Sequence, residues 1–494
     1  MMDVDICIIG GGLCGVGIAS YLKKTLRDKT FALIEKRNDL GGTWDLCRYP
    51  GIRTDSDMYT YGYHFRAFHG SKIFREGSEI VDYIRSTARE NNLAEIMLLG
   101  HVVRRAEWQT GCARWTLHAE NITTSEPCRI TSRYVVFCTG YYAYDSGYTP
   151  EFANVDKFKG RIVHPQSWPS DIDYTDKEIV IVGSGATSVT LAPVLAKTAR
   201  HVTVLQRSPS YVVPMSATSP TASFLFALLP ATLAYPLVRC LFILYQIITT
   251  ALLTYYSSLG KKVILRKTAL ALGDEAPAHM KHFTPTYNPW DQRLCLCPNG
   301  DLFEAIKAKK VSYVTDEIHS FTSDGLLLQS MKNSGDDTRQ FLPADLVVTA
   351  TGFNLQALGG VEVVVDGEVK PPAECFTYKG VMLCGVPNFF WCMGYNGASL
   401  TLKVEPTAVY ISRMLNFMTL NRYTSIEPTI PPVSCRQSSQ RVFSSTSTYV
   451  KRNGHLFPQQ GTCTPWRYIQ DYVSDMWPLK FEPIVKNDKN LKFS

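Results

Sequence analysis

The strongest constraint on the fold lies at the start of the chain, which reads "DVDICIIGGGLCGVGIASYL". Residues 4–9 form an apolar run typical of a buried parallel strand, and Gly10, Gly12 and Gly15 follow in GxGxxG spacing before a helical pattern. The next apolar run, "TFALIE", ends in Glu35, twenty residues after Gly15. Strand, glycines, helix, second strand and terminal acid together predict a dinucleotide-binding unit rather than a glycine-rich turn without a ligand.

Each residue of this pattern has an expected role. Gly10 makes the tight turn, Gly12 lets the backbone approach a pyrophosphate, and Gly15 permits close helix–strand packing. The helix N-terminus faces the phosphates, and Glu35 can bind ribose hydroxyls. The acid alone does not distinguish FAD from NAD.

The loop that follows, "GGTWDLCRYPGIRTDSDMYTYGYHF" (residues 41–65), crowds glycines, aromatic rings and charges together. A loop with this much specific chemistry is more often a site than a connector, although its aromatic side chains could simply pack at the surface. We predict that its cofactor-binding residues are Gly42, Thr43, Trp44, Asp45, Arg53, Asp55 and Tyr61.

A second fingerprint, "EIVIVGSGATS", occupies residues 178–188. Ser188 replaces the third glycine, and the next strand ends in Gln206, with Arg207 beside it, where an acid would stand. An acid would repel a 2′-phosphate and an arginine can bind one, so we expect NADPH rather than NADH, unless Arg207 is only a surface residue. The predicted cofactor-binding residues here are Gly183, Ser184, Gly185, Ala186, Thr187 and Arg207.

Two further segments resemble each other, "RYVVFCTGYY" (133–142) and "ADLVVTATGFN" (344–354), and both read as a strand followed by Thr-Gly. Each segment is placed where the chain would leave one nucleotide-binding domain and enter the neighbouring domain. The sequence therefore predicts an α/β fold with two Rossmann-like domains, one for FAD and one for NADPH, and an electron path from nicotinamide to flavin.

Composition limits the remaining function classes. The 494 residues suffice for two or three domains, and the net charge of +7 comes from scattered Lys and Arg, so nucleic-acid binding is not expected. The 14 cysteines contain no CxxC, which argues against a metal site and a disulfide framework and favours reduced thiols in a cytoplasmic protein. No signal peptide is expected, because the first fingerprint begins within ten residues of the start.

The linker between the two fingerprints, "FKGRIVHPQSWP" (158–169), carries Phe158, Gly160, His164 and Trp168. This spacing resembles the F-x-G-x-x-x-H-x-x-x-W-P pattern of type I Baeyer–Villiger monooxygenases, whereas related N- and S-oxygenating flavin monooxygenases usually have Tyr or Phe in place of the Trp. Other segments, such as "YNPWDQRLCLCPNGDLFEAIKAKK", "VVTATGFNLQALGG" and "YKGVMLCGVPNFFWCMGYNGASLTLK", look most like the ethionamide-activating monooxygenases.

The resemblance implies a domain organisation and a reaction. FAD reduced by NADPH would add O2 at the flavin C4a, and the peroxide would attack an apolar ketone to give an ester, or oxidise a sulfide. The expected parts are an FAD domain split between 1–145 and 356–494 (with the C-terminal tail), a linker and NADPH domain split between 146–209 and 276–355, and a helical insertion at 210–275.

The resemblance also implies roles for single residues. Arg293 falls where the family's catalytic arginine is expected, and Asp55 matches the acid that orients it, with a structural ion pair at the domain seam as the alternative. The linker residues would couple domain movement to the NADPH site, unless Trp168 only packs the seam.

Three other functions stay open at this point. The first is an enzyme restricted to N- or S-oxygenation, which Trp168 disfavours. The second is a flavin disulfide reductase, which needs a redox-active cysteine pair near the flavin, and no closely spaced pair follows the first fingerprint. The third is a flavin-bearing binding module without turnover, against which Arg53, Asp55 and Arg293 argue.

Residues 210–260 carry one charge, Arg239, and include "CLFILYQIITTALLTYY" (240–256), at the low end of the length that spans a bilayer. A single span would split the NADPH domain, and the other arm of a hairpin is short and contains Pro230 and Pro236. We expect helices over the active site, either buried around an apolar substrate tunnel or in peripheral contact with a membrane through 224–256.

Overall fold

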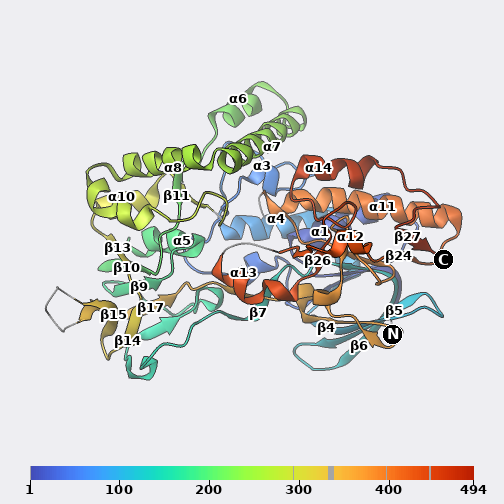
Figure 1. The fold of residues 1–494 in the computed structure, drawn as a ribbon, viewed down its shortest axis with the longest axis horizontal. Helices are drawn as coiled ribbons and strands as arrows, with labels where there is room; N and C mark the ends of the chain where they lie inside the picture. The colour runs from blue at the N-terminus through green and yellow to red at the C-terminus, as the bar shows by residue number, and fades with distance from the viewer. Residues whose placement is uncertain (1, 293, 332–338, 396–397, 444–446) are drawn as a thin grey trace.

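The computed structural model describes residues 2–292, 294–331, 339–395, 398–443 and 447–494. Figure 1 shows two lobes, each built around a sheet, with α6, α7 and α8 along one edge of the molecule. Arg293, the expected catalytic arginine, lies outside the described residues.

The first sheet begins with four parallel strands in the order β3-β2-β1-β6. On the far side of β6 the sheet continues through antiparallel β5 and β4 to β19 and β20, and β23 also pairs with β6. Strands from two distant parts of the chain therefore share one sheet. Its described strands are β1 (Met2–Ile9), β2 (Phe31–Glu35), β3 (Met97–Leu99), β4 (His101–Gln109), β5 (Arg114–Asn121), β6 (Pro127–Phe137), β19 (Glu362–Val365), β20 (Glu368–Val369) and β23 (Phe389–Trp391).

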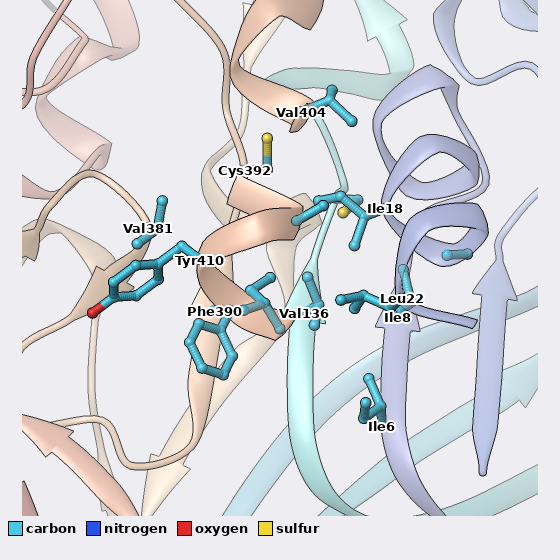
Figure 2. Close-up of a cluster of buried hydrophobic side chains, with 14 of the residues drawn as sticks. Ile6, Ile8, Ile18, Leu22, Val136, Val381, Phe390, Cys392, Val404 and Tyr410 are labelled. Carbon is cyan, nitrogen blue, oxygen red and sulfur yellow. The ribbon is translucent and has the colours of Figure 1, made fainter. Parts of the chain in front are cut away.

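Both faces of this sheet are covered, which explains the continuous apolar run of β1. Ile6 and Ile8 enter one core, while Cys7 and Ile9 enter the core on the other face. Figure 2 shows the first core, in which the sheet packs against α1 and α11. The helices that contribute to it are α1 (Leu13–Thr25), α4 (Gly77–Glu90) and α11 (Val404–Asn421).

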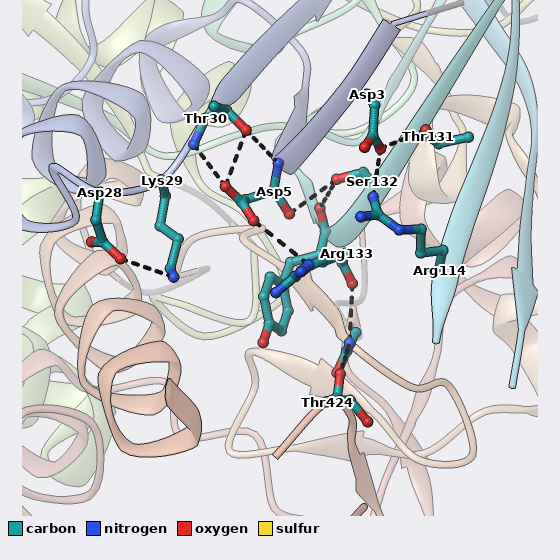
Figure 3. A network of polar contacts seen from close by, with 12 residues as sticks. Asp3, Asp5, Asp28, Lys29, Thr30, Arg114, Thr131, Ser132, Arg133 and Thr424 are labelled. Carbon is teal, nitrogen blue, oxygen red and sulfur yellow. Dashed lines mark hydrogen bonds and ion pairs between the residues drawn. The ribbon is translucent and has the colours of Figure 1, made fainter. Parts of the chain in front are cut away.

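A polar network joins the first half of β1 to the start of β2 and to the middle of β6 (Figure 3). The Asp5 carboxylate accepts hydrogen bonds from the Thr30 backbone N–H at 2.9 Å and the Thr30 hydroxyl at 3.0 Å. Arg133 of β6 lies 3.7 Å from the same carboxylate. These bonds fix one end of β1, and the glycine turn leaves from the other end.

The second sheet is parallel throughout, in the order β13-β10-β9-β17-β8. Its first four strands repeat the arrangement β3-β2-β1-β6 of the first sheet, with α5 (Ala186–Leu195) in the place of α1. The α/β fold with two Rossmann-like units is therefore confirmed. The strands are β8 (Arg161–Val163), β9 (Glu178–Val182), β10 (His201–Gln206), β13 (Val311–Thr315) and β17 (Leu346–Thr349).

The two connections between the lobes lie side by side. β7 (Tyr142–Gly147) follows the first Thr-Gly segment, β18 (Phe353–Leu355) follows the second, and the two strands pair antiparallel. The pairing of the two strands that follow the Thr-Gly segments thus brings both crossovers to one place.

The smaller elements complete the lobes. A described antiparallel sheet contains β14 (Ile318–Phe321), β15 (Gly325–Met331) and β16 (Arg339–Pro343). The remaining short strands are β11 (Val212–Met215), β12 (Cys295–Pro298), β21 (Thr377–Tyr378), β22 (Met382–Leu383), β24 (Ile426–Pro428), β25 (Gln440–Arg441), β26 (Gln459–Gln460) and β27 (Leu491–Phe493). The remaining short helices are α2 (Thr43–Leu46), α3 (Met58–Tyr61), α9 (Ala276–His279), α10 (Asp301–Lys307), α12 (Val433–Arg436), α13 (Thr448–Asn453) and α14 (Tyr472–Met476).

The apolar insertion folds as α6 (Pro220–Leu228), α7 (Ala231–Tyr255) and α8 (Ser257–Leu272). Pro236 lies inside α7, which is long and apolar enough to cross a membrane, yet only 11% of its most apolar window is buried. The expectation of a buried insertion is therefore wrong, because α7 packs along one side only and leaves the other side to solvent.

One cysteine pair departs from the expectation of reduced thiols. Cys435 and Cys463 form a disulfide, with their Cα atoms 5.6 Å apart, and the other 12 cysteines are free. The residues are 28 positions apart, so their spacing carries no signal. Folding brings them together because the Thr462 backbone N–H donates to the Cys435 carbonyl.

Candidate cofactor and active site

A cavity of about 350 Å³ is lined by residues at the N-termini of both α1 and α5. The predicted site residues in its wall are Gly10, Gly12, Glu35, Gly42, Thr43, Trp44, Arg53, Asp55, Tyr61, Ala186 and Thr187. The predicted residues outside this wall are Gly15, Asp45, Gly183, Ser184, Gly185 and Arg207. The two fingerprints thus open onto a shared space.

Different atoms surround the three glycines of the first fingerprint, so a side chain at each position would meet a different obstacle. Gly10 has φ of +109°, and a Cβ there would lie 2.4 Å from the Cys138 carbonyl oxygen. A Cβ on Gly15 would lie 1.8 Å from the Gly10 carbonyl oxygen. A Cβ on Gly12, by contrast, would meet its nearest atom, the Gly42 Cα, at 3.5 Å. The protein itself therefore excludes a side chain at Gly10 and Gly15 but leaves room at Gly12, where a close-lying ligand would supply the constraint.

Glu35 lies at the end of β2 with its carboxylate at the glycine turn. Its Oε2 accepts from the Gly11 N–H at 2.5 Å, and its Oε1 accepts from the Arg37 N–H at 2.8 Å. Burial raises the pKa of Glu35, while these two hydrogen bonds oppose the rise. The position suits a carboxylate that binds ribose hydroxyls beside the pyrophosphate.

The second fingerprint repeats this geometry. Gly183 has φ of +129°, and a Cβ there would lie 2.3 Å from the Ala350 carbonyl oxygen. Its N–H donates to the Leu205 carbonyl at 2.8 Å, as the Gly10 N–H does to the Ile34 carbonyl at 2.8 Å. Gly185, the N-cap of α5, has nothing within 4 Å of an added Cβ. The open position at this helix N-terminus again fits a phosphate.

The end of β10 differs from the end of β2. Gln206 donates to the His282 carbonyl at 2.8 Å and to the Thr315 hydroxyl at 3.0 Å, whereas Glu35 accepts from its glycine turn. Arg207, the next residue, is exposed. The residue at the end of β10 is therefore a neutral amide, whereas a carboxylate in its place would repel a 2′-phosphate.

Arg452 of α13 is a basic residue near Arg207 that the sequence did not reveal. Its guanidinium lies 3.4 Å from the centroid of the Tyr148 ring. Burial lowers the pKa of Arg452, and the charge of Arg207 lowers it further. One terminal nitrogen of Arg452 is buried without a hydrogen-bond partner among the described residues. A phosphate near both guanidinium groups would relieve this repulsion.

Aromatic side chains form part of the wall. The Trp44 indole donates to the Tyr61 hydroxyl at 2.7 Å, and the two rings meet edge to face. Four tyrosines in the wall were not predicted as site residues: Tyr49, Tyr141, Tyr142 and Tyr144. Tyr49 is hydrogen-bonded to the Thr187 side chain of α5, and burial raises the pKa of its hydroxyl, which therefore stays protonated.

Asp45 is a predicted cofactor-binding residue that does not line the cavity. Its carboxylate is buried and binds Arg37 and Arg48, each at 2.7 Å, and Arg85 at 3.1 Å. Burial would raise the pKa of Asp45, but the hydrogen bonds from Arg37 and Arg48 hold it below its usual value. Asp45 thus clamps the loop, and its contact with a cofactor stays a prediction.

The linker residues contact both crossovers. The His164 Nε2 donates to the Gly352 carbonyl at 3.1 Å, while its Nδ1 accepts from the Gln166 N–H at 3.1 Å. These two bonds define a neutral ring protonated on Nε2, and burial lowers the pKa of His164.

The other linker residues are packed. Phe158 meets Phe321 edge to face, and a Cβ on Gly160 would clash with the Phe158 ring at 2.4 Å. Trp168 packs on the core of the second lobe. The conformational role of these residues stays a prediction.

Four thiols line the cavity, from Cys14, Cys47, Cys138 and Cys392. A hydrogen bond with Cys138, together with burial, raises the pKa of Cys14, and burial raises the pKa of Cys138. Redox exchange requires thiolates, so these groups argue against a flavin disulfide reductase. Among the described side chains, no group of three or more His, Cys, Asp or Glu could hold a metal ion.

Comparisons with known proteins agree with this geometry. The family model described as flavin-binding monooxygenase-like matches residues 4–258. The chain is 41% identical over 492 residues to the FAD-containing monooxygenase EthA of Mycobacterium tuberculosis, covering 99% of this chain and 98% of that protein. The resemblance stated from the sequence is therefore confirmed.

Solved structures share the fold. An oxidised steroid monooxygenase bound to NADP matches with a TM-score of 0.76 at 20% identity, covering 100% of this chain and 99% of that one. OTEMO in complex with FAD and NADP matches with a TM-score of 0.69 at 21% identity, covering 86% and 88%. The chain belongs to the flavin-binding monooxygenase-like family, and it has the fold of Baeyer–Villiger monooxygenases.

Proposed function

We propose that the enzyme inserts one oxygen atom of O2 into apolar ketones and also oxidises sulfides. In the ketone reaction, NADPH, a proton, O2 and the ketone would give NADP+, water and the ester. The observation that carries the proposal is the single cavity onto which both helix N-termini open, because it would bring nicotinamide and flavin together.

The residues present fit two dinucleotides. Gly12 and Gly185 leave open backbone at the N-termini of α1 and α5, and Glu35 lies beside the first of them. We assign FAD to residues 1–145 and 356–494, and NADPH to residues 146–209 and 276–355. When bound, FAD would accept a hydride from NADPH and supply the oxygen-transfer chemistry.

The cavity also offers an apolar surface for the substrate. Its wall includes the side chains of Ile52, Leu296, Met393, Leu400 and Val404. Such a surface favours ketones and thioethers with alkyl chains and excludes water from the reacting atoms.

Two charged residues would act on the reaction. Asp55 and Arg53 both line the cavity. From the family resemblance we assign Arg293 as the cation that stabilises the negative charge developed during oxygen transfer, and Asp55 as the residue that positions it. An oriented charge in a water-poor site typically contributes about 3–4 kcal/mol to such a step.

Domain movement would link the two half-reactions. His164 bridges the linker to Gly352, which precedes the crossover strand β18. A change at the NADPH site could therefore reach the linker through this hydrogen bond. We place the enzyme in the cytoplasm.

The test is NADPH consumption with product analysis over a panel of linear ketones and thioethers. We expect esters from ketones, sulfoxides from thioethers and consumption matched to product. Arg293→Ala should bind FAD and oxidise NADPH slowly with release of hydrogen peroxide, but form no ester, and Asp55→Ala should show a milder form of this defect. Sulfoxides without ester from any ketone would instead restrict the enzyme to heteroatom oxygenation.

A further inference from the structure

The helix α7 presents a stripe of apolar side chains to solvent, while its inward side packs Tyr235 and Val238 against the protein. Its outward stripe contains large apolar residues at helical spacing, each between 46% and 83% exposed: Leu233, Leu237, Leu241, Leu244, Ile248, Leu252 and Tyr255. The inward side carries Arg239, which is 7% exposed, and Gln246 seven residues later. A surface helix of a water-surrounded protein normally carries polar side chains on its outward side.

Two polar anchors hold α7 in this orientation. Arg239 donates from Nη1 to the carbonyls of Tyr59 at 2.6 Å and Gly62 at 2.9 Å. Gln246 donates from Nε2 to Asp57 at 2.7 Å and to the Thr60 hydroxyl at 2.8 Å. Rotation of α7 that buried its leucines would break all four bonds and leave the buried Asp57 carboxylate without its amide partner. The exposed apolar stripe is therefore built into the fold.

The neighbouring helices extend the stripe into a surface. Phe224 and Leu228 of α6 are each 64% exposed, and Leu259 and Leu270 of α8 are 60% and 73% exposed. Figure 1 shows the three helices together along one edge of the molecule. We call this the insertion face. Exposed apolar area of this extent marks an interaction surface.

The charge of the insertion face is basic only. Residues 211–273 contain no Asp or Glu, and α8 carries the exposed residues Lys262, Arg266 and Lys267 beside its apolar side chains. Tyr245, Tyr255 and Tyr256 are also exposed on this face. Leucines, interfacial tyrosines and bases without acids are the composition of a helix that lies in an anionic lipid surface.

We propose that the insertion face docks on the surface of a bilayer that contains anionic lipid, with α7 in the plane of the interface and not across it. The anchors to residues 57–62 keep α7 against the first lobe, so the helix cannot leave the protein to span the bilayer. A second copy of the chain fits less well, because a symmetric contact through this face would bring bases toward bases.

The insertion face lies close to the cofactor cavity. The Gln246 Oε1 accepts from the Ser399 N–H at 3.4 Å, and the next residue, Leu400, lines the cavity. Thr401, also in the wall, donates to the Tyr61 carbonyl at 2.6 Å. An apolar substrate dissolved in the lipid would therefore reach the cavity over a short path; this consequence rests on the proposed function, whereas docking does not.

The test is co-sedimentation of the FAD-loaded enzyme with vesicles of phosphatidylcholine alone or with phosphatidylglycerol. We expect binding to the anionic vesicles and weak binding to the neutral ones. Lys262→Gln/Arg266→Gln/Lys267→Gln should weaken anionic binding about 100-fold. The control Lys159→Gln/Lys486→Gln/Lys489→Gln removes the same charge from exposed sites elsewhere and should bind like the wild type. Equal binding by both triple variants, or no vesicle binding at all, would overturn the proposal.

Two native cysteines offer an internal footprint. Cys240 is exposed within the outward stripe of α7, and Cys112 is exposed in the turn between β4 and β5. Anionic vesicles should protect Cys240 from a maleimide reagent while Cys112 reacts as before. Protection of Cys240 at high protein concentration without vesicles would identify a second copy as the occupant. NADPH consumption with a short water-soluble ketone, measured without vesicles, tests the proposed function separately.

Discussion

Arg53 and Asp301 lie 248 positions apart in the chain and form a two-bond ion pair at the edge of the cofactor cavity. Arg53 donates from Nη1 to one carboxylate oxygen at 2.5 Å and from Nη2 to the other at 3.1 Å. Asp301 opens α10 of the second lobe, while Arg53 belongs to the loop after α2 of the first lobe. The pair therefore ties the two lobes together where they enclose the cavity.

We predict that this pair stabilises the closed arrangement of the lobes. The side chains are 17% and 32% exposed, so the pair should contribute more than a surface ion pair. A double-mutant cycle with Arg53→Gln and Asp301→Asn should give a coupling of about 1–3 kcal/mol in the free energy of unfolding. If Arg53 contacts a cofactor, Arg53→Gln should also weaken coenzyme affinity, whereas Asp301→Asn should not. Strictly additive effects on unfolding would contradict the pairing.

The glycines of the first fingerprint should separate folding from flavin binding. Gly12→Ala has room in the protein, so it should fold with the wild-type melting temperature of the FAD-free enzyme, yet purify without yellow colour. Gly15→Ala should give little soluble protein, because its Cβ would lie 1.8 Å from a backbone oxygen. The checks are the absorbance spectrum and thermal denaturation. If the Gly12→Ala variant retained one FAD per chain, the pyrophosphate of FAD would not lie against this residue.

Coenzyme choice should depend on two arginines. Arg207→Ala and Arg452→Ala should each raise the KM for NADPH ten- to a hundred-fold, about 1.5–3 kcal/mol, with little change for NADH. Lys451→Ala is the matched control for Arg452, because Lys451 is an exposed neighbour on α13. Steady-state kinetics with both coenzymes make the comparison. An equal rise in KM for the two coenzymes would remove the residue concerned from 2′-phosphate binding.

Acid stability should depend on His282. Burial lowers its pKa to about 4, helped by the charges of Lys281 and His279, and its Nδ1 lies 2.7 Å from the Thr315 hydroxyl. Since the unfolded imidazole titrates near 6.5, between about pH 6.5 and pH 4 the unfolded chain binds a proton that the folded chain does not. The stability present above pH 6.5 should therefore be lost as the pH falls through this window.

The measurement is the melting temperature from pH 7.5 to pH 4.5 for the wild type and His282→Asn. Other groups titrate in the same range, so the difference between the two curves isolates this histidine. We expect a shallower loss of stability in the variant. Parallel curves would show that His282 is not a buried neutral group.

The fingerprints were predictable from the sequence because their constraints are local. Gly10 and Gly183 adopt positive φ next to a backbone oxygen, and Glu35 closes a strand adjacent to that turn. The apolar runs of β1 and β9 reflect sheets buried on both faces, which a short window of residues records directly. The pattern of strands and glycines by itself therefore determined the α/β class and the two nucleotide-binding units.

The remaining features arose only from contacts between distant segments. No spacing in the chain links Arg53 to Asp301, Cys435 to Cys463 or Arg452 to Tyr148, because each pair depends on how separate elements pack. The exposure of α7 has the same origin. Its composition was read correctly as apolar, but composition does not say which side of a helix meets the protein. The tertiary structure decided this, because the bonds from Arg239 and Gln246 to residues 57–62 hold these two side chains inward and leave the leucines outside.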